Sequence, residues 1–163
     1  MQYVQQCPSH LGLITEPEHW HGRQSEFTLI RTYHLQLCVH NDNPISERKS
    51  VCFGDLRNEK FILLDEQSYY PQIVREKAAE YGFEANIAFR SADMYLLCSL
   101  ANQNKGVLIC ISVPMTENFK DLRFVPIEDE DMTFSIAFLY QNYEKLGAPE
   151  KRFIEFMRSM ECE

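Results

Sequence analysis

The sequence lacks the features that would assign it to several broad classes of protein. No apolar run is long enough to span a bilayer, so a membrane-spanning helix is not expected. Lysine and arginine form no cluster beyond a short segment at 47–49, and the formal net charge is −8, whereas a DNA-binding domain usually carries a basic face. The chain by itself is therefore not expected to bind nucleic acid.

Signals for export and for catalysis are also missing. The first residues, MQYVQQCPSHLG, have neither the basic segment nor the apolar core of a signal peptide, which favours a cytoplasmic protein. No Ser-His-Asp order, phosphate-binding glycine loop or distinctive pair of carboxylates occurs. We therefore predict that the protein is not an enzyme.

Motifs for metals and disulfides are absent as well. The chain has six cysteines but no CxxC pair, and Cys38, Cys98 and Cys110 lie inside apolar runs, as buried reduced thiols do. His19 and His21 flank the only tryptophan, but zinc requires further ligands, so a solvated loop is the simpler interpretation. We predict no metal site and no cofactor.

The residues that are present have an ordinary globular composition. The 163 residues are 45% hydrophobic and 25% charged, which indicates one domain or two small lobes. Between 61 and 113, short apolar runs alternate with amphipathic stretches, which predicts a β-α-β-α-β unit with parallel strands. The strands are expected at 61–64, 86–90 and 106–113, with one helix capped by Ser68 and stopped by Gly82, and a second helix capped by Ser91.

The flanking segments predict further elements. Residues 10–15 are expected to form a short buried strand, and 27–42 an extended stretch that divides into two strands where the alternation breaks at 31–33. A short helix capped by Ser50 is expected next, and a strand at 133–141. A final amphipathic helix at 148–160 carries an apolar stripe that consists of Phe153, Ile154, Phe156, Met157 and Met160.

Three long stretches resemble one known family in content and order. They are HLGLIT, NPISERKSVCFGDLRNEKFILLDEQSYY and EYGFEANIAFRSADMYLLCSLANQNKGVLICI. With the closing strands and helix, they resemble the effector-sensing domain of LysR-type transcriptional regulators over nearly the whole chain. Two departures stand out, because Asn104 occupies the place of a usual glycine and Ile111 that of a usual proline. Asparagine, like glycine, tolerates the left-handed region.

The resemblance implies a fold and a role. The fold is α/β and type II periplasmic-binding-protein-like, with one complete lobe around a mixed, mainly parallel sheet and one partial lobe. Residues 34–133 would form the complete lobe, and 1–33 with 134–163 the partial one. A small-molecule effector would bind between the lobes and control DNA binding through a winged helix-turn-helix that this chain does not contain. Members of the family form homodimers, so a homodimer is possible.

The candidate ligand-binding residues come from the turns expected to face that cleft. Backbone amides at a helix N-terminus bind anions, tyrosine rings stack on ligands, and arginine pairs with carboxylates. The resemblance adds one residue from the first lobe and one from the hinge. The candidates are Thr15, His34, Glu66, Gln67, Ser68, Tyr69, Tyr70, Arg90 and Ser91.

Each candidate also has a simpler interpretation. Ser68 and Ser91 would cap helices in any case, the tyrosines could cover a sheet edge, and Arg90 could form a surface ion pair. Asp65 and Glu66 weaken the case for an anionic effector and favour one that bears an amino group. The turn at 65–70 has no cysteine, whereas redox-sensing members of the family have one there.

Three other functions remain open on these grounds. The chain could be a solute-binding protein of the same fold, which would require an export signal. It could be an enzyme on a similar two-lobed fold, which would require a catalytic constellation. It could also be a fragment without independent ligand binding, because the partial lobe would supply only part of the cleft.

Overall fold

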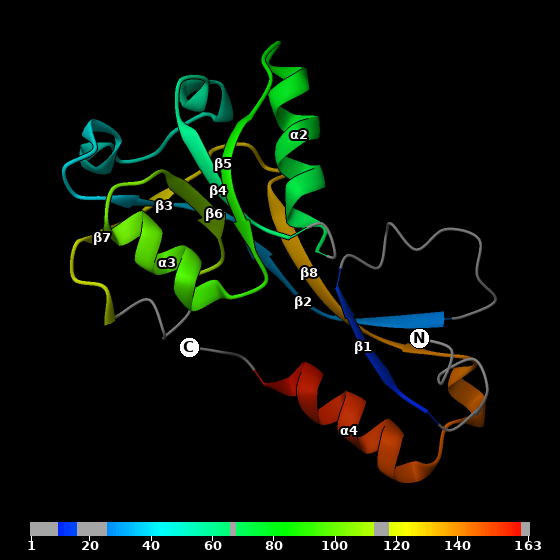
Figure 1. Cartoon of the computed structure of the whole chain (residues 1–163). Coiled ribbons are helices and arrows are strands. Elements are labelled where there is room, and N and C mark those ends of the chain that lie inside the picture. Colours follow the sequence, from blue (N-terminus) through cyan, green and yellow to red (C-terminus); the bar gives the residue numbers. More distant parts are fainter. Residues whose placement is uncertain (1–9, 16–25, 66–67, 113–117, 161–163) are drawn as a thin grey trace. The chain divides into compact units, whose positions relative to one another are not determined.

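The computed structural model describes residues 10–15, 26–65, 68–112 and 118–160 (Figure 1). The chain divides into two compact units, of which the larger comprises residues 34–133 and the smaller comprises the segments before and after it. The expected loop around His19 and His21 lies outside the described residues, as do the candidates Glu66 and Gln67.

The larger unit is built on a five-stranded sheet with the order β5-β4-β6-β3-β7. Strand β4 pairs in parallel with β5 and β6, whereas β3 pairs in antiparallel fashion with β6 and β7. The predicted β-α-β-α-β unit is therefore confirmed, within a mixed sheet. The strands are β3 (Gln36–His40), β4 (Lys60–Leu64), β5 (Asn86–Ser91), β6 (Val107–Cys110) and β7 (Leu122–Pro126).

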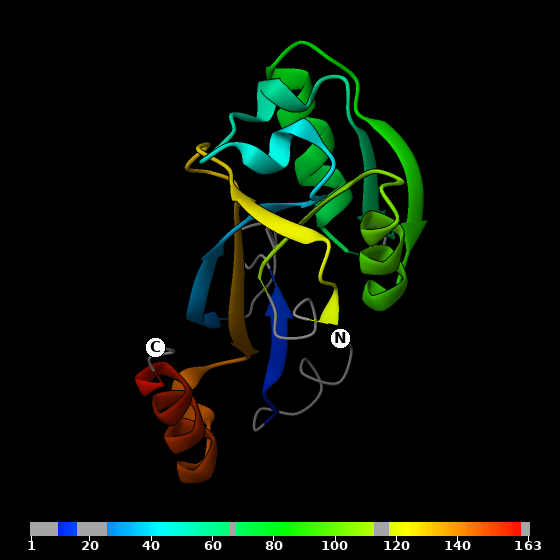
Figure 2. The ribbon, with the colours of Figure 1, turned by 90° about the vertical axis from the view of Figure 1, so that its left-hand side faces the viewer.

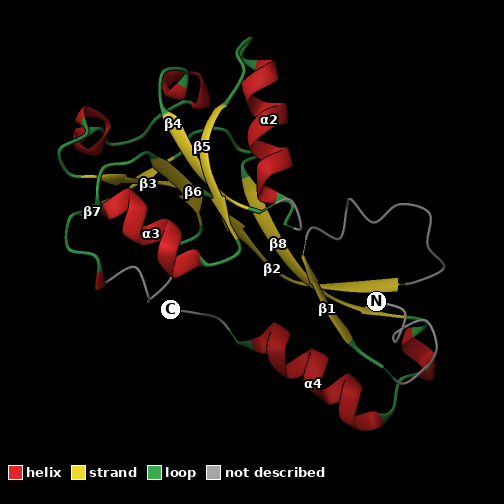
Figure 3. Cartoon of the chain, in the orientation of Figure 1, coloured by secondary structure: helices red, strands yellow, loops and turns green. Residues whose placement is uncertain are grey.

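Two helices connect the parallel strands, α2 (Tyr70–Glu80) and α3 (Met94–Asn102), as Figure 3 shows. On α3, Leu97, Cys98 and Ala101 are buried against side chains of β3, β4 and β6. Residues 61–63 of β4 are fully buried. Because side chains of a strand alternate between its two faces, β4 is buried on both, as its apolar run predicts.

Both helices end in the same hydrogen-bonded cap. Gly82 follows α2 with a φ of 70°, and Asn104 follows α3 with a φ of 55°. At each end, the next two N–H groups bond back to carbonyls of the last turn, which is the Schellman arrangement. The predicted stop at Gly82 and the left-handed tolerance of Asn104 are confirmed.

The predicted caps at the starts of these helices are wrong. Helix α2 begins at Tyr70 after Tyr69, because the amide and hydroxyl of Ser68 both bond to the carbonyl oxygen of Asp65 and close a separate turn. Helix α3 is capped by Asp93, whereas Ser91 is the last residue of β5. In both places the serine hydroxyl forms a hydrogen bond within a turn that precedes the helix, so it does not cap the helix.

The helix predicted after Ser50 is shorter than expected and has a different cap. A 3-10 turn, η3 (Phe53–Leu56), follows Cys52, and the Ser50 hydroxyl donates to Glu128 instead. The reason is that Val51 forms a parallel bridge with Ile127, which holds the backbone extended at this point. A second 3-10 turn, η2 (Pro44–Glu47), is capped by Asn43.

The smaller unit contains a three-stranded sheet with the order β1-β8-β2. Its strands are β1 (Gly12–Thr15), β2 (Glu26–His34) and β8 (Thr133–Tyr140). The stretch at 27–42 does form two strands, but the break is at Leu35 rather than at 31–33. Leu35 is buried and its N–H donates to the carbonyl oxygen of Met132, between the end of β2 and the start of β3.

Helix α4 (Ala148–Ser159) follows β8 through the short turn η5 (Tyr143–Lys145), as Figure 2 shows. Its Ile154 packs against Phe138 and Tyr140. Its predicted apolar stripe is only partly buried, because Phe153 and Phe156 are exposed. The apolar residues of α4 therefore extend beyond the helix face that packs against the three-stranded sheet. Strand β1 is likewise less buried than predicted, since Leu13 is 67% exposed and Ile14 is its one buried residue.

Candidate functional site

The carboxyl ends of β4 and β5 lie side by side in the larger unit. Leu64 pairs with Ser91 in the parallel register, so the turn that follows β4 and the turn that follows β5 meet at one edge of the sheet. In open α/β sheets, ligands bind outside the carboxyl ends of the strands. The structure therefore brings the candidates of residues 68–70 close to Ser91.

The turn before α2 offers fewer free amides than expected. The N–H of Ser68 already donates to Asp65, Pro71 has no N–H, and the N–H of Gln72 donates to the carbonyl oxygen of Tyr69. Tyr70 is buried, while Tyr69 is half-buried. Of the two tyrosines, Tyr69 is the one placed to contact a ligand.

The start of α3 is occupied by an acidic side chain of the chain itself. The Asp93 carboxylate accepts the N–H groups of Tyr95 and Leu96 at 2.9 and 3.2 Å, and the N–H of Asp93 donates to the Ser91 hydroxyl at 3.0 Å. The positive end of the helix dipole is therefore compensated. With half-buried Asp65 near the neighbouring turn, this edge disfavours an anionic group.

Arg90 and Ser91 point away from each other, because successive side chains of a strand alternate between faces. Arg90 lines a separate pocket of about 440 Å³ between α2 and β5, together with Arg75 across it and an apolar wall. The other lining residues are Ala79, Phe83, Glu84, Ala85 and Ile87. Arg90 therefore lies on the face of β5 next to α2, whereas Ser91, the last residue of β5, lies on the other face.

The remaining candidates lie in other parts of the chain. Thr15 is the exposed last residue of β1 and pairs with Ile136 of β8 in the smaller unit. His34 is exposed at the end of β2, where the chain passes from one unit to the other. Glu66 and Gln67 are outside the described residues. Their roles remain predictions.

The ionisable side chains with shifted pKa values lie away from this edge. Burial lowers the pKa of Lys77, but hydrogen bonds to Asp131 and Glu80 outweigh it and raise that pKa above its usual range. A hydrogen bond to Asp129 raises the pKa of Tyr81 to about 12. These groups hold α2 to the segment that follows β7, which is a structural role.

The three buried cysteines share one core. Cys38, Cys98 and Cys110 are free thiols packed between α3 and the sheet, as predicted. Burial raises the pKa of Cys98 to about 11, and the hydrogen bond to Cys38, together with burial, raises that of Cys110. Within the described ranges, no three His, Cys, Asp or Glu side chains gather as metal ligands, and no helix is long and apolar enough to cross a membrane.

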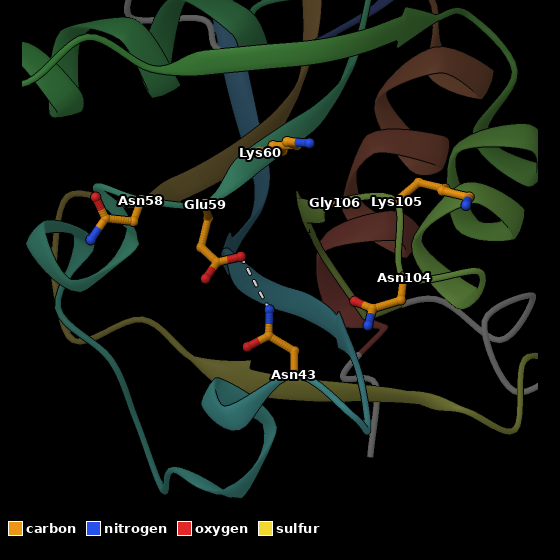
Figure 4. Close-up of a pocket in the computed structure, with 7 residues that line it drawn as sticks. All are labelled: Asn43, Asn58, Glu59, Lys60, Asn104, Lys105 and Gly106. Carbon is orange, nitrogen blue, oxygen red and sulfur yellow. Dashed lines mark hydrogen bonds between the residues drawn. The ribbon is translucent and has the colours of Figure 1, made fainter.

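Sequence reasoning missed a polar pocket at the amino ends of β4 and β6. The candidate turns described above lie at the carboxyl ends of β4 and β5. The pocket is lined by Asn43, Asn58, Glu59, Lys60, Asn104, Lys105 and Gly106 (Figure 4). Its residues come from three separate segments, so no spacing along the chain indicates it. The one local signal was Asn104 in place of a glycine.

The chain is similar to a curated transcription regulator. It is 29% identical over 138 residues to the malolactic fermentation system transcriptional activator of Lactococcus lactis subsp. lactis (strain IL1403). The match covers 84% of this chain and 45% of the relative, so the chain spans less than half the length of that protein.

Solved structures share the fold. HinK, a LysR family transcriptional regulator from Pseudomonas aeruginosa, is 21% identical with a TM-score of 0.82, covering 98% of this chain and 56% of that one. The effector-binding domain of BenM with its effector benzoate is 24% identical with a TM-score of 0.70, covering 84% and 63%. The fold is therefore the type II periplasmic-binding-protein-like α/β fold of LysR effector-binding domains, as predicted.

The family model described as the LysR substrate binding domain matches residues 8–161, which is almost the whole chain. The match agrees with the mixed sheet order, the two connecting helices and the curated relative, which is a transcriptional activator. The chain therefore belongs to the LysR substrate-binding domain family.

Proposed function

We propose that this chain senses a small-molecule effector, which binds between its two lobes and controls the DNA-binding activity of a full-length regulator. The observation that supports this most directly is the family match over residues 8–161. In the larger unit, the turns that follow β4 and β5 also lie at one edge of the sheet, where open α/β sheets bind ligands. The two lobes of the proposal correspond to residues 34–133 and to 1–33 with 134–163.

The larger lobe would present hydroxyl groups and negatively charged carboxylates to the effector. Ser68 and Ser91 offer hydroxyl groups, Tyr69 offers a ring and a phenol, and Asp65 and Asp93 add negative charge nearby. Carboxylates attract ammonium groups and repel carboxylates. We therefore propose an effector with an amino or hydroxyl group directed at this edge.

Control of DNA binding would follow from differential affinity. A ligand shifts a conformational equilibrium only by as much as it binds one state better than the other. In this proposal the effector favours one arrangement of the lobes, and a DNA-binding part elsewhere in the regulator responds. A cytoplasmic location and a homodimer are further parts of the same proposal.

The test is a thermal melt of the chain alone and with amino acids, aromatic acids and small carboxylates. A ligand at a hundred times its dissociation constant adds about 2.7 kcal/mol to the stability. This corresponds to a rise of roughly 5–10 °C for a domain of this size. The variant Ser91→Ala should reduce the rise, whereas Ser159→Ala on α4 should leave it unchanged.

The outcomes separate the remaining functions. A cooperative melt that no compound shifts, in this chain and in a longer form of the protein, would contradict effector sensing. A shift seen only in the longer form would mean that this chain does not bind ligand independently. A solute-binding protein of the same fold is less well supported, because the curated relative is a transcriptional activator.

A further inference from the structure

A second pocket lies in the larger unit, at the amino ends of β4 and β6. It has a volume of about 420 Å³, within the range of small-molecule sites. Lys60 is the first residue of β4, and Gly106 directly precedes β6. The turns with Ser68 and Ser91 follow the carboxyl ends of β4 and β5, so this pocket is separate from the effector site proposed above.

The backbone of the pocket is held in place by close packing. A Cβ atom at Gly106 would lie 2.4 Å from the carbonyl oxygen of Lys60, so only glycine allows the two segments to approach this closely. Asn104 is in the left-handed conformation, and its N–H donates to Ala101 at the end of α3. The backbone of residues 104–106, which forms one side of the pocket, is therefore held in a defined conformation.

Two side chains on the facing wall hold each other. The Nδ2 group of Asn43 donates to Oε2 of Glu59 at 3.1 Å, and Oδ1 of Asn43 accepts the N–H of Ile45 at 2.9 Å. Asn43 is thereby fixed at both ends and orients the carboxylate. Oε1 of Glu59 has no partner among the described residues. It is available to a ligand, in a half-buried position.

The other polar side chains of the pocket have no partners within the described part of the chain. Lys60 and Lys105 take part in no ion pair there, and the side-chain amide of Asn104 makes no hydrogen bond to a described residue. Figure 4 shows the side-chain amide of Asn104 directed toward the Asn43–Glu59 pair, Lys60 above Glu59, and Lys105 on the far side of the pocket with its side chain extending away from that pair. The pocket thus contains one carboxylate and two ammonium groups.

We propose that this pocket binds a small zwitterion that carries both an ammonium and a carboxylate group, as a free amino acid does. The ligand ammonium would bind Glu59, and the ligand carboxylate would bind Lys60 and Lys105 and accept from Asn104. A simple anion would meet the Glu59 carboxylate, and a simple cation would meet two lysines. Only a ligand with both charges satisfies every group.

The test is an NMR titration that follows the backbone amide signals of the chain. L-alanine carries both charges, propionate lacks the amine, and ethylamine lacks the carboxylate. We expect L-alanine to shift the signals of Glu59, Lys105 and Gly106 in a saturable way. Because each charge-assisted hydrogen bond is a strong contact, propionate and ethylamine should bind roughly tenfold more weakly or worse.

Charge-removing variants of similar shape complete the test. Glu59→Gln and Lys105→Gln should each weaken L-alanine binding by roughly tenfold while the rest of the spectrum stays folded. Glu155→Gln on α4 and Lys120→Gln before β7 are matched controls that should bind as the parent does. Failure of L-alanine to bind, equal binding of propionate, or parent-like binding by both pocket variants would overturn the proposal.

This proposal does not rest on the effector proposal. The variant Ser91→Ala should leave the shifts at Glu59 and Gly106 unchanged, since it lies at the other end of the strands. Conversely, Glu59→Gln should leave the melting-point rise from a cleft effector unchanged. A loss of both responses in either variant would mean that there is one site and not two.

Discussion

The hydroxyl of Tyr81 donates a hydrogen bond of 2.6 Å to one carboxylate oxygen of Asp129, whose other oxygen accepts the N–H of Phe53 at 2.8 Å. One acidic residue after β7 thus holds both the end of α2 and the start of η3. The ring of Tyr81 also stacks on that of Phe53, with centroids 6.4 Å apart.

This contact predicts a pH dependence. The pKa of Tyr81 is raised from 10.0 to about 12 in the folded protein, so the folded state retains its proton more tightly than the unfolded chain. The stabilisation is complete below pH 10 and is lost as the pH rises toward 12. In Asp129→Asn, NMR titration of the Tyr81 ring should find a pKa nearer 10. An unchanged pKa would contradict the assigned cause.

A second prediction concerns the buried ammonium of Lys77. Its Nζ lies 2.7 Å from Glu80 and 2.5 Å from Asp131, and the side chain is buried in α2. Removing a partner of a buried charge leaves it poorly compensated, so Asp131→Ala should lower the free energy of unfolding by roughly 1–3 kcal/mol. Urea unfolding would measure this.

The matched control for that variant is Glu155→Ala on α4, whose carboxylate is in no ion pair with a described residue. It should change the stability by less than about 0.5 kcal/mol. If the two variants were equally stable, the contact to Asp131 would behave as an ordinary surface pair, contrary to the burial of Lys77.

Two glycines provide a matched pair for backbone packing. A Cβ atom at Gly106 would meet the rigid backbone oxygen of Lys60 at 2.4 Å, whereas one at Gly147 would meet the flexible end of Glu150 at the same distance. Gly106→Ala should therefore cost roughly 1–3 kcal/mol of stability. Gly147→Ala should cost clearly less, because the Glu150 side chain can move. Thermal melts would rank them, and the reverse order would contradict the packing argument.

The buried thiols predict selective alkylation. Burial raises the pKa of Cys98 to about 11, and that of Cys110 is raised as well, so neither forms thiolate near pH 8. In mass spectrometry after iodoacetamide treatment, Cys38, Cys98 and Cys110 should be labelled only once the protein unfolds. Labelling of any of them in the native state would mean that the core around α3 opens readily.

Exposed Cys52 should be labelled in the native protein, but slowly. A hydrogen bond to Glu128 raises its thiol pKa, and Asp55 and Asp129 add negative charge nearby. In Glu128→Gln the pKa should fall and labelling should be faster at the same pH. Equal labelling rates for the two proteins would contradict this cause.

Prediction from the sequence succeeded where the determinants are local. The alternation of apolar runs and amphipathic stretches predicted the three parallel strands and both connecting helices, and Gly82 predicted the end of α2. The serine caps failed because serine also closes turns. At Ser68 the hydroxyl bonds within its own turn, and Asp93, two residues beyond Ser91, is the cap of α3.

The candidate site was predictable only in part. That the turns after β4 and β5 meet follows from a parallel sheet, and the alternation of side chains separates Arg90 from Ser91, but which of the two faces α2 depends on the register of β5 beside β4. The register shifts between Phe61 and Ile62, and a one-residue change moves side chains to the other face. No pattern in the sequence locates that irregularity.

The sequence by itself determined the order of the elements, the parallel core strands and the family of this chain, because these depend on hydrophobic periodicity, turn residues and extended similarity. The tertiary structure alone decided which polar groups lie together. Asn43, Glu59 and Asn104 converge at one end of the sheet, and Asp129 joins Phe53 to Tyr81. Such contacts are set by strand register and packing over long separations, whose energies depend on geometry that no local pattern contains.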